Sequence, residues 1–104
     1  MGVAHLIVLA GAFALTFLGA AVAWAAPNAT KRVAGIVVAH IGAVLVLAAL
    51  GAPESVVGAA VAIALAQVVM GVAIVVRLQE AYGAIESRDV DVADDGAEPA
   101  EPGA

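Results

Sequence analysis

Three long stretches without a charged residue limit what this chain can fold into more than any other feature. They span residues 1–30, 33–53 and 55–76. A helix that crosses the hydrocarbon core of a bilayer needs about 20 mostly apolar residues, and each stretch has that length. A soluble chain of 104 residues has no interior large enough to bury three such helices. The sequence therefore predicts an all-α integral membrane protein with three transmembrane helices.

The composition excludes several classes of protein. Hydrophobic residues make up 64% of the chain, whereas soluble domains are about half apolar. The chain has no cysteine, which excludes disulfides, thiolate metal sites and thiol nucleophiles. It also has no nucleotide-binding loop, HExxH motif, nucleophile elbow or basic nucleic-acid patch. We therefore expect no catalytic site, no metal, no cofactor and no nucleic-acid partner.

Short polar turns separate the three predicted helices, which cover about residues 3–25, 31–50 and 53–82. Pro27 ends the first helix, and Asn28 or Thr30 can cap the second. Gly51 ends the second helix, and Pro53 suits the first turn of the third. Because both connections are short, we expect an up-down-up domain over residues 1–82.

The basic residues predict the orientation of this domain. Lys31 and Arg32 lie in the first loop, and Arg77 and Arg88 follow the third predicted span. In an up-down-up topology these two regions share one side of the membrane. Loops rich in Lys and Arg stay in the cytoplasm. We therefore expect a multi-pass protein of the cell (inner or plasma) membrane, with its N-terminus outside and its C-terminus in the cytoplasm.

The segment AVAWAAP, residues 21–27, offers an alternative for the first stretch. Its small residues are similar to the cleavage site of a signal peptide. However, no Lys or Arg precedes the apolar stretch, and the stretch is longer than a usual signal-peptide core. We therefore expect the first stretch to remain as a transmembrane helix.

The C-terminal residues 83–104 form an acidic tail. From residue 86 onward this tail has seven Asp or Glu against one Arg and no aromatic residue. Such a segment buries too little apolar surface to offset its conformational entropy. We expect a disordered cytoplasmic tail that is simply solvated, and a docking role for it is the alternative.

Small residues recur at helical spacing in the second and third predicted helices. In lipid, helices associate through close packing of small residues, because the surrounding lipid is as apolar as the helices. Three thin helices with small faces make a poor isolated bundle, so we expect a subunit of a larger membrane assembly. The predicted packing residues are Gly35, Ala39 and Ala43 in the second helix, and Ala60, Ala64, Gln67 and Gly71 in the third.

Four polar residues lie in or near the spans. His5 lies near a membrane interface, and Thr16 can donate a hydrogen bond to its own helix backbone. His40 is the one ionisable group near the middle of a span. Such a residue either takes part in proton transfer or, while neutral, donates a hydrogen bond to a neighbouring helix. Gln67 cannot titrate, so we favour a hydrogen-bonding role between helices for it.

The chain resembles a family of small membrane subunits. The turn NATKRVAGI at residues 28–36 has an Asn, a basic residue, a Gly and an aliphatic residue at the family's spacing. The segment ALAQVVMGVAIVV at 64–76 is similar to the family's third helix, and GAIESRDV at 83–90 resembles its short tail. The family is the K subunit of proton-pumping NADH–quinone oxidoreductase, which overlaps with the C subunit of Mrp-type multisubunit sodium/proton antiporters. The resemblance implies three transmembrane helices and hetero-oligomeric membrane partners.

Two departures from the family concern its ion-translocating carboxylates. The resemblance implies a buried Glu in the second helix, where this chain has Val37, and another in the third, where it has Gln67. The role of those carboxylates therefore does not carry over. His40 lies three residues after Val37, on nearly the same helix face, and a titratable group there could replace one of them in part.

These observations favour a small subunit of a complex-I-like or Mrp-like assembly that translocates cations or protons. Such a subunit would contribute helix packing, and His40 and Gln67 are its candidates for an ion pathway. It would have no active site of its own within the complex. The alternative is a membrane adaptor or assembly protein that docks through its acidic tail. A stand-alone channel is disfavoured, since three thin helices enclose no polar lumen.

Overall fold

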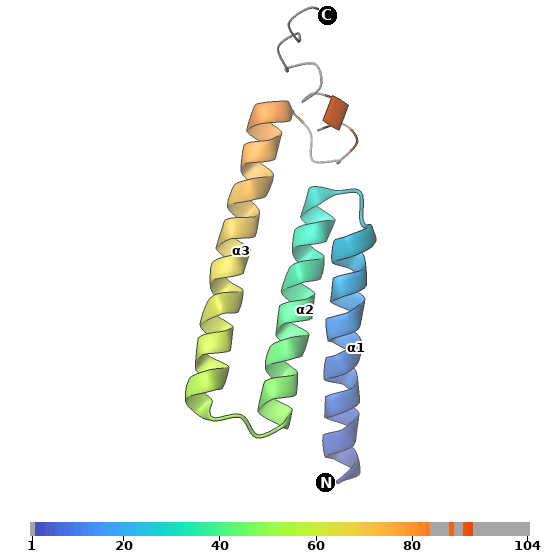
Figure 1. Cartoon of the computed structure of the whole chain (residues 1–104), viewed down its shortest axis with the longest axis vertical. Coiled ribbons are helices and arrows are strands. Elements are labelled where there is room, and N and C mark those ends of the chain that lie inside the picture. The colour runs from blue at the N-terminus through green and yellow to red at the C-terminus, as the bar shows by residue number, and fades with distance from the viewer. Residues whose placement is uncertain (1, 84–87, 89–90, 93–104) are drawn as a thin grey trace, which may run out of the picture.

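The computed structural model describes residues 2–83, 88, 91 and 92, and three helices make up nearly all of this part (Figure 1). They are α1 (Val3–Ala25), α2 (Ala29–Ala49) and α3 (Glu54–Tyr82). Each is long and apolar enough to cross a membrane. The bounds of α1 agree with the prediction, α2 begins two residues earlier than predicted and ends one earlier, and α3 begins one residue later. The helices are those of a membrane protein.

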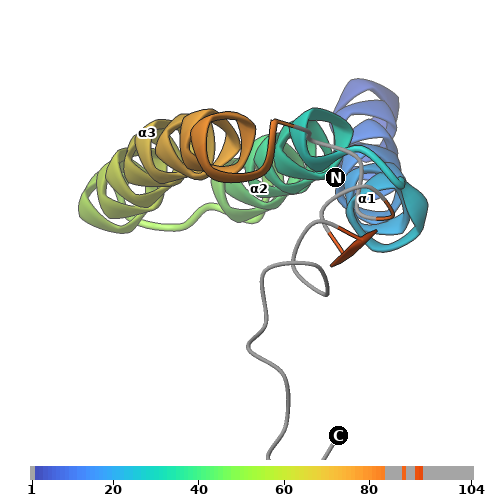
Figure 2. The ribbon, with the colours of Figure 1, turned by 90° about the horizontal axis from the view of Figure 1, so that it is seen from above.

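The three helices lie side by side in a single layer, with α2 in the middle (Figures 1 and 2). The extensive contacts are those of α2 with α1 and of α2 with α3. Because α1 and α3 lie on opposite sides of α2, no helix within the described part of the chain covers either broad face of the layer.

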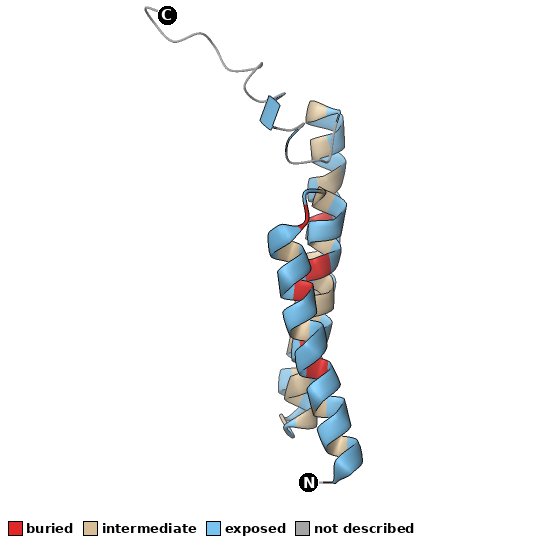
Figure 3. Cartoon of the chain, turned by 90° about the vertical axis from the view of Figure 1, so that its right-hand side faces the viewer, coloured by how far each residue is buried: buried red, intermediate tan, exposed pale blue. Residues whose placement is uncertain are grey.

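Burial in this layer is restricted to small residues (Figure 3). Large apolar side chains such as Phe17, Trp24 and Val69 are 69%, 88% and 70% exposed. A soluble protein would not tolerate so much exposed apolar surface, whereas a bilayer or a partner helix covers it. The buried residues of the described part are all Gly or Ala: Ala12, Gly19, Ala26, Gly35, Gly42 and Gly71.

The turn between α1 and α2 is held by side chains. The side-chain oxygen of Asn28 accepts hydrogen bonds from the backbone N–H groups of Thr30 (2.8 Å) and Lys31 (3.3 Å). This is an N-cap, which satisfies two of the N–H groups that a helix start leaves unpaired. Arg32 Nε donates to the backbone oxygen of Ala26, just beyond the end of α1. The prediction that Asn28 or Thr30 caps the second helix is thus confirmed for Asn28.

Replacing the cap tests its contribution. Asn28→Ala is expected to lower the free energy of unfolding by about 1 kcal/mol, because two backbone donors of α2 lose their acceptor. Asn28→Ser keeps a capping oxygen and should retain most of that stability. The measurement is unfolding of the detergent-solubilised chain followed by circular dichroism. Equal losses for the two variants would contradict the capping role.

The turn between α2 and α3 depends on a glycine. Gly51 has a φ of 79°, a left-handed conformation that glycine adopts without steric cost. The backbone N–H of Gly51 donates to Ala48 O, and that of Ala52 donates to Leu47 O. Pro53 then precedes α3, which carries Glu54 in its first turn. The turn therefore returns the chain within a few residues and places α3 beside α2.

The predicted acidic tail at residues 83–104 falls almost entirely outside the described residues. Of this segment the structure describes Gly83, Arg88, Asp91 and Val92. Gly83, with a φ of 65°, ends α3 and donates from its backbone N–H to Gln79 O. The predictions of disorder or docking for the tail stay predictions.

Candidate functional site

Direct backbone contact characterises the α1–α2 pair. A Cβ atom added to Gly35 would lie 2.6 Å from Ala23 N and 2.7 Å from Gly19 O. A Cβ on Gly42 would lie 2.5 Å from Thr16 Oγ1 and 2.6 Å from Thr16 N. These distances are too short for any real Cβ, so no residue but glycine fits at either position without moving a helix. We call Gly19, Gly35 and Gly42 the glycine seam.

The residues of α2 that face α1 differ in one position from the stripe predicted on α2. Gly35 is buried and Ala39 lies against Gly19 of α1, but Ala43 is exposed and Gly42 is buried instead. The reason is helix geometry: residues i, i+4 and i+7 stay within about 60° of one another, whereas i+8 is about 80° away from i. Ala43 is therefore turned toward one broad face of the layer.

The sequence contained a signal for the rest of the seam. On α1 the side toward α2 repeats at steps of three and four residues, as in the seam of a coiled coil. Reading α1 for small residues at that spacing would have identified Ala12, Gly19 and Ala26. The residues of α1 that are buried or partly buried are His5, Leu9, Ala12, Thr16, Gly19 and Ala23, and Ala26 follows at the end of the helix.

Thr16 behaves as its sequence context predicts. Its Oγ1 donates a hydrogen bond of 2.9 Å to Ala12 O, one turn earlier in α1. The bond satisfies the hydroxyl within its own helix and leaves the short side chain in contact with Gly42. Thr16 thus packs against Gly42 of the glycine seam, and the predicted hydrogen bond to its own helix backbone is confirmed.

The α2–α3 contact is looser than the α1–α2 contact. All four predicted packing residues of α3, which are Ala60, Ala64, Gln67 and Gly71, are partly or fully buried. At Gly71 an added Cβ would meet the Val33 side chain at 2.5 Å rather than a backbone atom. Contact through side chains keeps the two backbones farther apart, so α3 approaches α2 less closely than α1 does.

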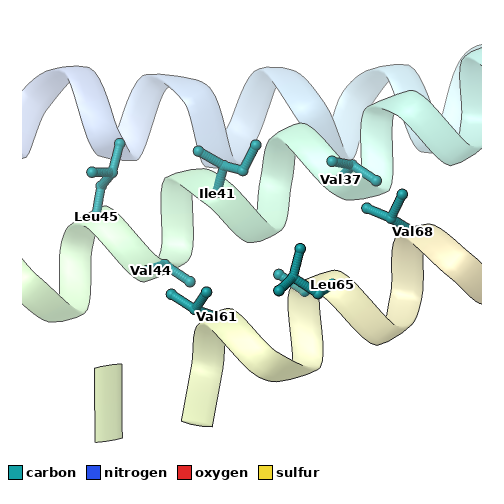
Figure 4. A pocket seen from close by; sticks show the side chains of 8 residues that line it. Val37, Ile41, Val44, Leu45, Val61, Leu65 and Val68 are labelled. Carbon is teal, nitrogen blue, oxygen red and sulfur yellow. The ribbon is translucent and has the colours of Figure 1, made fainter. Parts of the chain in front are cut away.

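An apolar groove of about 270 Å³ runs along one side of this looser contact (Figure 4). Val37, Ile41 and Leu45 of α2 line it together with Val61, Leu65 and Val68 of α3. No polar side chain takes part in the lining. The groove can therefore hold an apolar group but offers no hydrogen bond to orient one.

Gln67 lies in the α2–α3 contact and is partly buried. Its Oε1 atom is buried and has no hydrogen-bond partner among the described residues. A buried polar atom without a partner costs about 1–3 kcal/mol. Figure 4 shows Val37 beside Val68, the residue after Gln67, at one end of the groove. Val37 and Gln67 therefore lie at about the same level of the contact. The predicted role between helices would require a hydrogen bond from α2 to Oε1, and the structure has no such bond among the described residues.

His40 lies near the middle of α2 and is partly exposed. Its Nδ1 is 3.2 Å from Ile36 O, one turn earlier in the same helix. Since a carbonyl oxygen can only accept, this bond requires a proton on Nδ1. The Nε2 atom of the neutral ring is then an acceptor. His40 thus donates to its own helix, α2. A bond from His40 to a neighbouring helix, which was one of the two predictions, is not formed among the described residues.

His5 is a second polar group without a partner. It lies in the first turns of α1, and its Nε2 atom is buried without a hydrogen bond to the described residues. His5, His40 and Gln67 come from three different helices, and no group of three metal-ligating side chains forms among the described residues. The arrangement provides hydrogen-bonding groups within apolar surroundings.

Comparisons of the chain with protein-family models, with curated proteins and with solved structures find no match. The functional proposals therefore depend on the residues of the chain and on their arrangement.

Proposed function

We propose that the protein is a small membrane subunit of a complex-I-like or Mrp-like assembly that translocates cations or protons. One observation carries the proposal. Val37 and Gln67, at the two positions where the resembled family implies buried Glu residues, lie at about the same level of the α2–α3 contact. Two positions that are 30 residues apart in the sequence thus lie close together in one interface. Positions with a joint role would be arranged in this way.

In this proposal the protein lies in the inner or plasma membrane of the cell, and its three helices run up-down-up. The N-terminus is outside and the C-terminus is in the cytoplasm. Lys31, Arg32 and Arg77 support this orientation. The first two lie at the start of α2 and the third lies near the end of α3, and these two ends are adjacent in the layer (Figure 1). Positively charged ends of this kind stay on the cytoplasmic side.

The subunit contributes helix packing to a hetero-oligomer. A single layer of three helices has two broad apolar faces, and no helix of the described part covers either one. Its carboxylate positions hold Val37 and Gln67, neither of which can carry a proton. His40, three residues after Val37, is the titratable group that remains near the middle of a span.

The role of His40 in ion movement is tested in the assembled complex. If His40 takes part, His40→Leu should lower cation-dependent proton translocation by about tenfold or more, as loss of a proton-transfer group does. Translocation is measured in membrane vesicles with a pH-sensitive dye. Full activity of His40→Leu would remove His40 from the ion pathway and leave a packing role for the subunit.

The proposed function as a whole is tested by purification of the tagged full-length chain in a gentle detergent. We expect large, many-helix antiporter-like subunits to be recovered in stoichiometric amounts, and mass spectrometry identifies them. A chain that ends after Val90 should recover the same subunits, because the helices provide the contacts. Loss of all partners on removal of the tail would instead favour an adaptor that docks through its acidic segment.

A further inference from the structure

The two broad faces of the helical layer differ in chemistry. On one face, which we call the His40 face, one groove lies between α1 and α2 and another between α2 and α3. His40 lines both grooves. The opposite face, which we call the aliphatic face, includes the grooves lined by Val38 and by Ile41. These two residues are three positions apart and are neighbours on α2. Ile36 and Ile41 are five positions apart, about 140° around the helix, and so belong to different faces.

Aromatic side chains accompany His40 on the His40 face. Trp24 lines one of its grooves. Phe17 precedes Trp24 by seven residues and lies on the same side of α1. Phe13 and Phe17 stack with their ring centroids 6.5 Å apart. On the aliphatic face, the groove between α2 and α3 is lined only by Val, Leu, Ile and Ala. Lipid chains satisfy such a surface, whereas a polar group within the bilayer requires a protein partner.

The hydrogen bonding of His40 defines the partner group. With the Nδ1 proton donated to Ile36 O, the neutral ring offers Nε2 as an acceptor. No hydrogen bond joins Nε2 to a described residue. In the hydrocarbon core no water is present to donate to it, so the favourable solution is a donor on another transmembrane helix.

The His40 ring of a second copy does not supply that donor. If His40 lay on the two-fold axis of a symmetric pair of His40 faces, it would meet its own copy. Two neutral rings with the proton on Nδ1 would then bring two Nε2 acceptors together, and neither could donate. The chemistry of His40 therefore excludes a bond between the two His40 rings and calls for a partner that brings its own donor. A second copy that meets the face away from the axis is the alternative occupant, which the crosslinking experiment below distinguishes.

We propose that the His40 face binds a transmembrane helix of a different subunit, and that this helix presents a hydrogen-bond donor such as Ser, Thr, Asn or Gln level with His40. The aliphatic face contacts lipid. The proposal rests on the proposed function only in that it requires the chain to have a membrane partner. It goes further by naming the contact surface and the chemistry of the partner group.

Site-specific photo-crosslinking in intact membranes tests which face meets protein. A benzophenone amino acid is introduced at Ile36, on the His40 face, or at Ile41, on the aliphatic face. The two isoleucines are matched, since both belong to α2 and are 41% and 48% exposed. Ile36 should give an adduct with one other protein, and Ile41 should give no protein adduct. Equal adducts from both, adducts from Ile41 alone, no protein adduct from either, or an adduct of Ile36 with a second copy would each overturn the proposal.

Variants of His40 test the hydrogen bond. His40→Leu should lower the yield of the Ile36 adduct about threefold, the mean effect of a hydrogen bond between membrane helices. His40→Gln keeps an acceptor oxygen and should retain most of the yield. Equal yields for the two variants would overturn the donor assignment. If His40→Leu fails to accumulate, His40→Ala, which also lacks an acceptor, takes its place in the comparison with His40→Gln.

The crosslinked protein also separates this proposal from the proposed function. An Ile36 adduct with a membrane protein that is unrelated to antiporters would support the His40 face as the interface and contradict the proposed assembly. Recovery of antiporter-like subunits together with adducts only from Ile41 would support the assembly and overturn the His40 face.

Discussion

Gly35→Ala is expected to separate α1 from α2 and to destabilise the helical layer by about 2 kcal/mol, the middle of the range for overpacked sites. The added Cβ would lie 2.6 Å from Ala23 N and 2.7 Å from Gly19 O. Both are backbone atoms, so no change of rotamer can relieve the contact and the helices have to move apart. The loss should exceed the gain of about 0.5–1 kcal/mol that alanine brings to a helix interior. The measurement is unfolding of the purified chain in mixed micelles, followed by circular dichroism.

Gly58→Ala is the matched control for this prediction. Gly58 lies within α3, and an added Cβ meets nothing within 4 Å. The control should therefore be as stable as the unaltered chain, or more stable by up to about 1 kcal/mol. If Gly35→Ala and Gly58→Ala have the same stability, the α1 and α2 backbones are not in direct contact at Gly35.

The second large effect is expected at Gln67. Gln67→Glu keeps the shape of the side chain but introduces a carboxylate at the α2–α3 contact, where Oε1 already has no partner among the described residues. An ionised carboxylate in such a place is costly, and we expect the α2–α3 contact to weaken by about 2 kcal/mol or more. The loss should be greater in alkaline than in acidic buffer, since only the ionised form carries the cost of a buried charge.

Gln67→Leu provides the comparison. It removes a buried amide whose oxygen has no partner, so the isolated chain should be as stable as before or more stable by about 1 kcal/mol. Both variants are measured by energy transfer between labels on α2 and α3 during unfolding in micelles. If Gln67→Leu weakens the contact as much as Gln67→Glu, the amide contributes a hydrogen bond that links the helices. In the assembled complex, a loss confined to Gln67→Leu would instead show that a partner subunit bonds to the amide.

The positions of the helices along the chain could be predicted from the sequence. Long apolar stretches, a capping residue at Asn28 and a turn glycine at Gly51 act within a few residues, so their effect does not depend on the rest of the fold. The predicted helix ends lie within two residues of those in the structure. The predicted packing residues Gly35, Ala39, Ala64 and Gly71 are buried or partly buried, and Ala43 is exposed.

The candidate site could be predicted only in part. His40 and Gln67 stand out as polar residues in apolar spans, and that signal is local. Their hydrogen bonds could not be predicted, because these depend on the rotation of each helix about its axis. His40 donates to its own helix, and Gln67 Oε1 has no partner among the described residues. The sequence left a bond to a neighbouring helix open for His40 and favoured one for Gln67.

The sequence by itself determined that the chain has three apolar helices joined by short polar turns, because length and hydropathy act on each segment separately. Only the tertiary structure decided that α2 lies in the middle of a single layer, that Gly19, Gly35 and Gly42 bring α1 and α2 into backbone contact, and that His40 lies on one broad face. The physical reason is that lipid is as apolar as a leucine side chain, so hydrophobicity does not mark which side of a membrane helix meets another helix. That choice depends on the fit between two surfaces, and the fit exists only once both helices are in place.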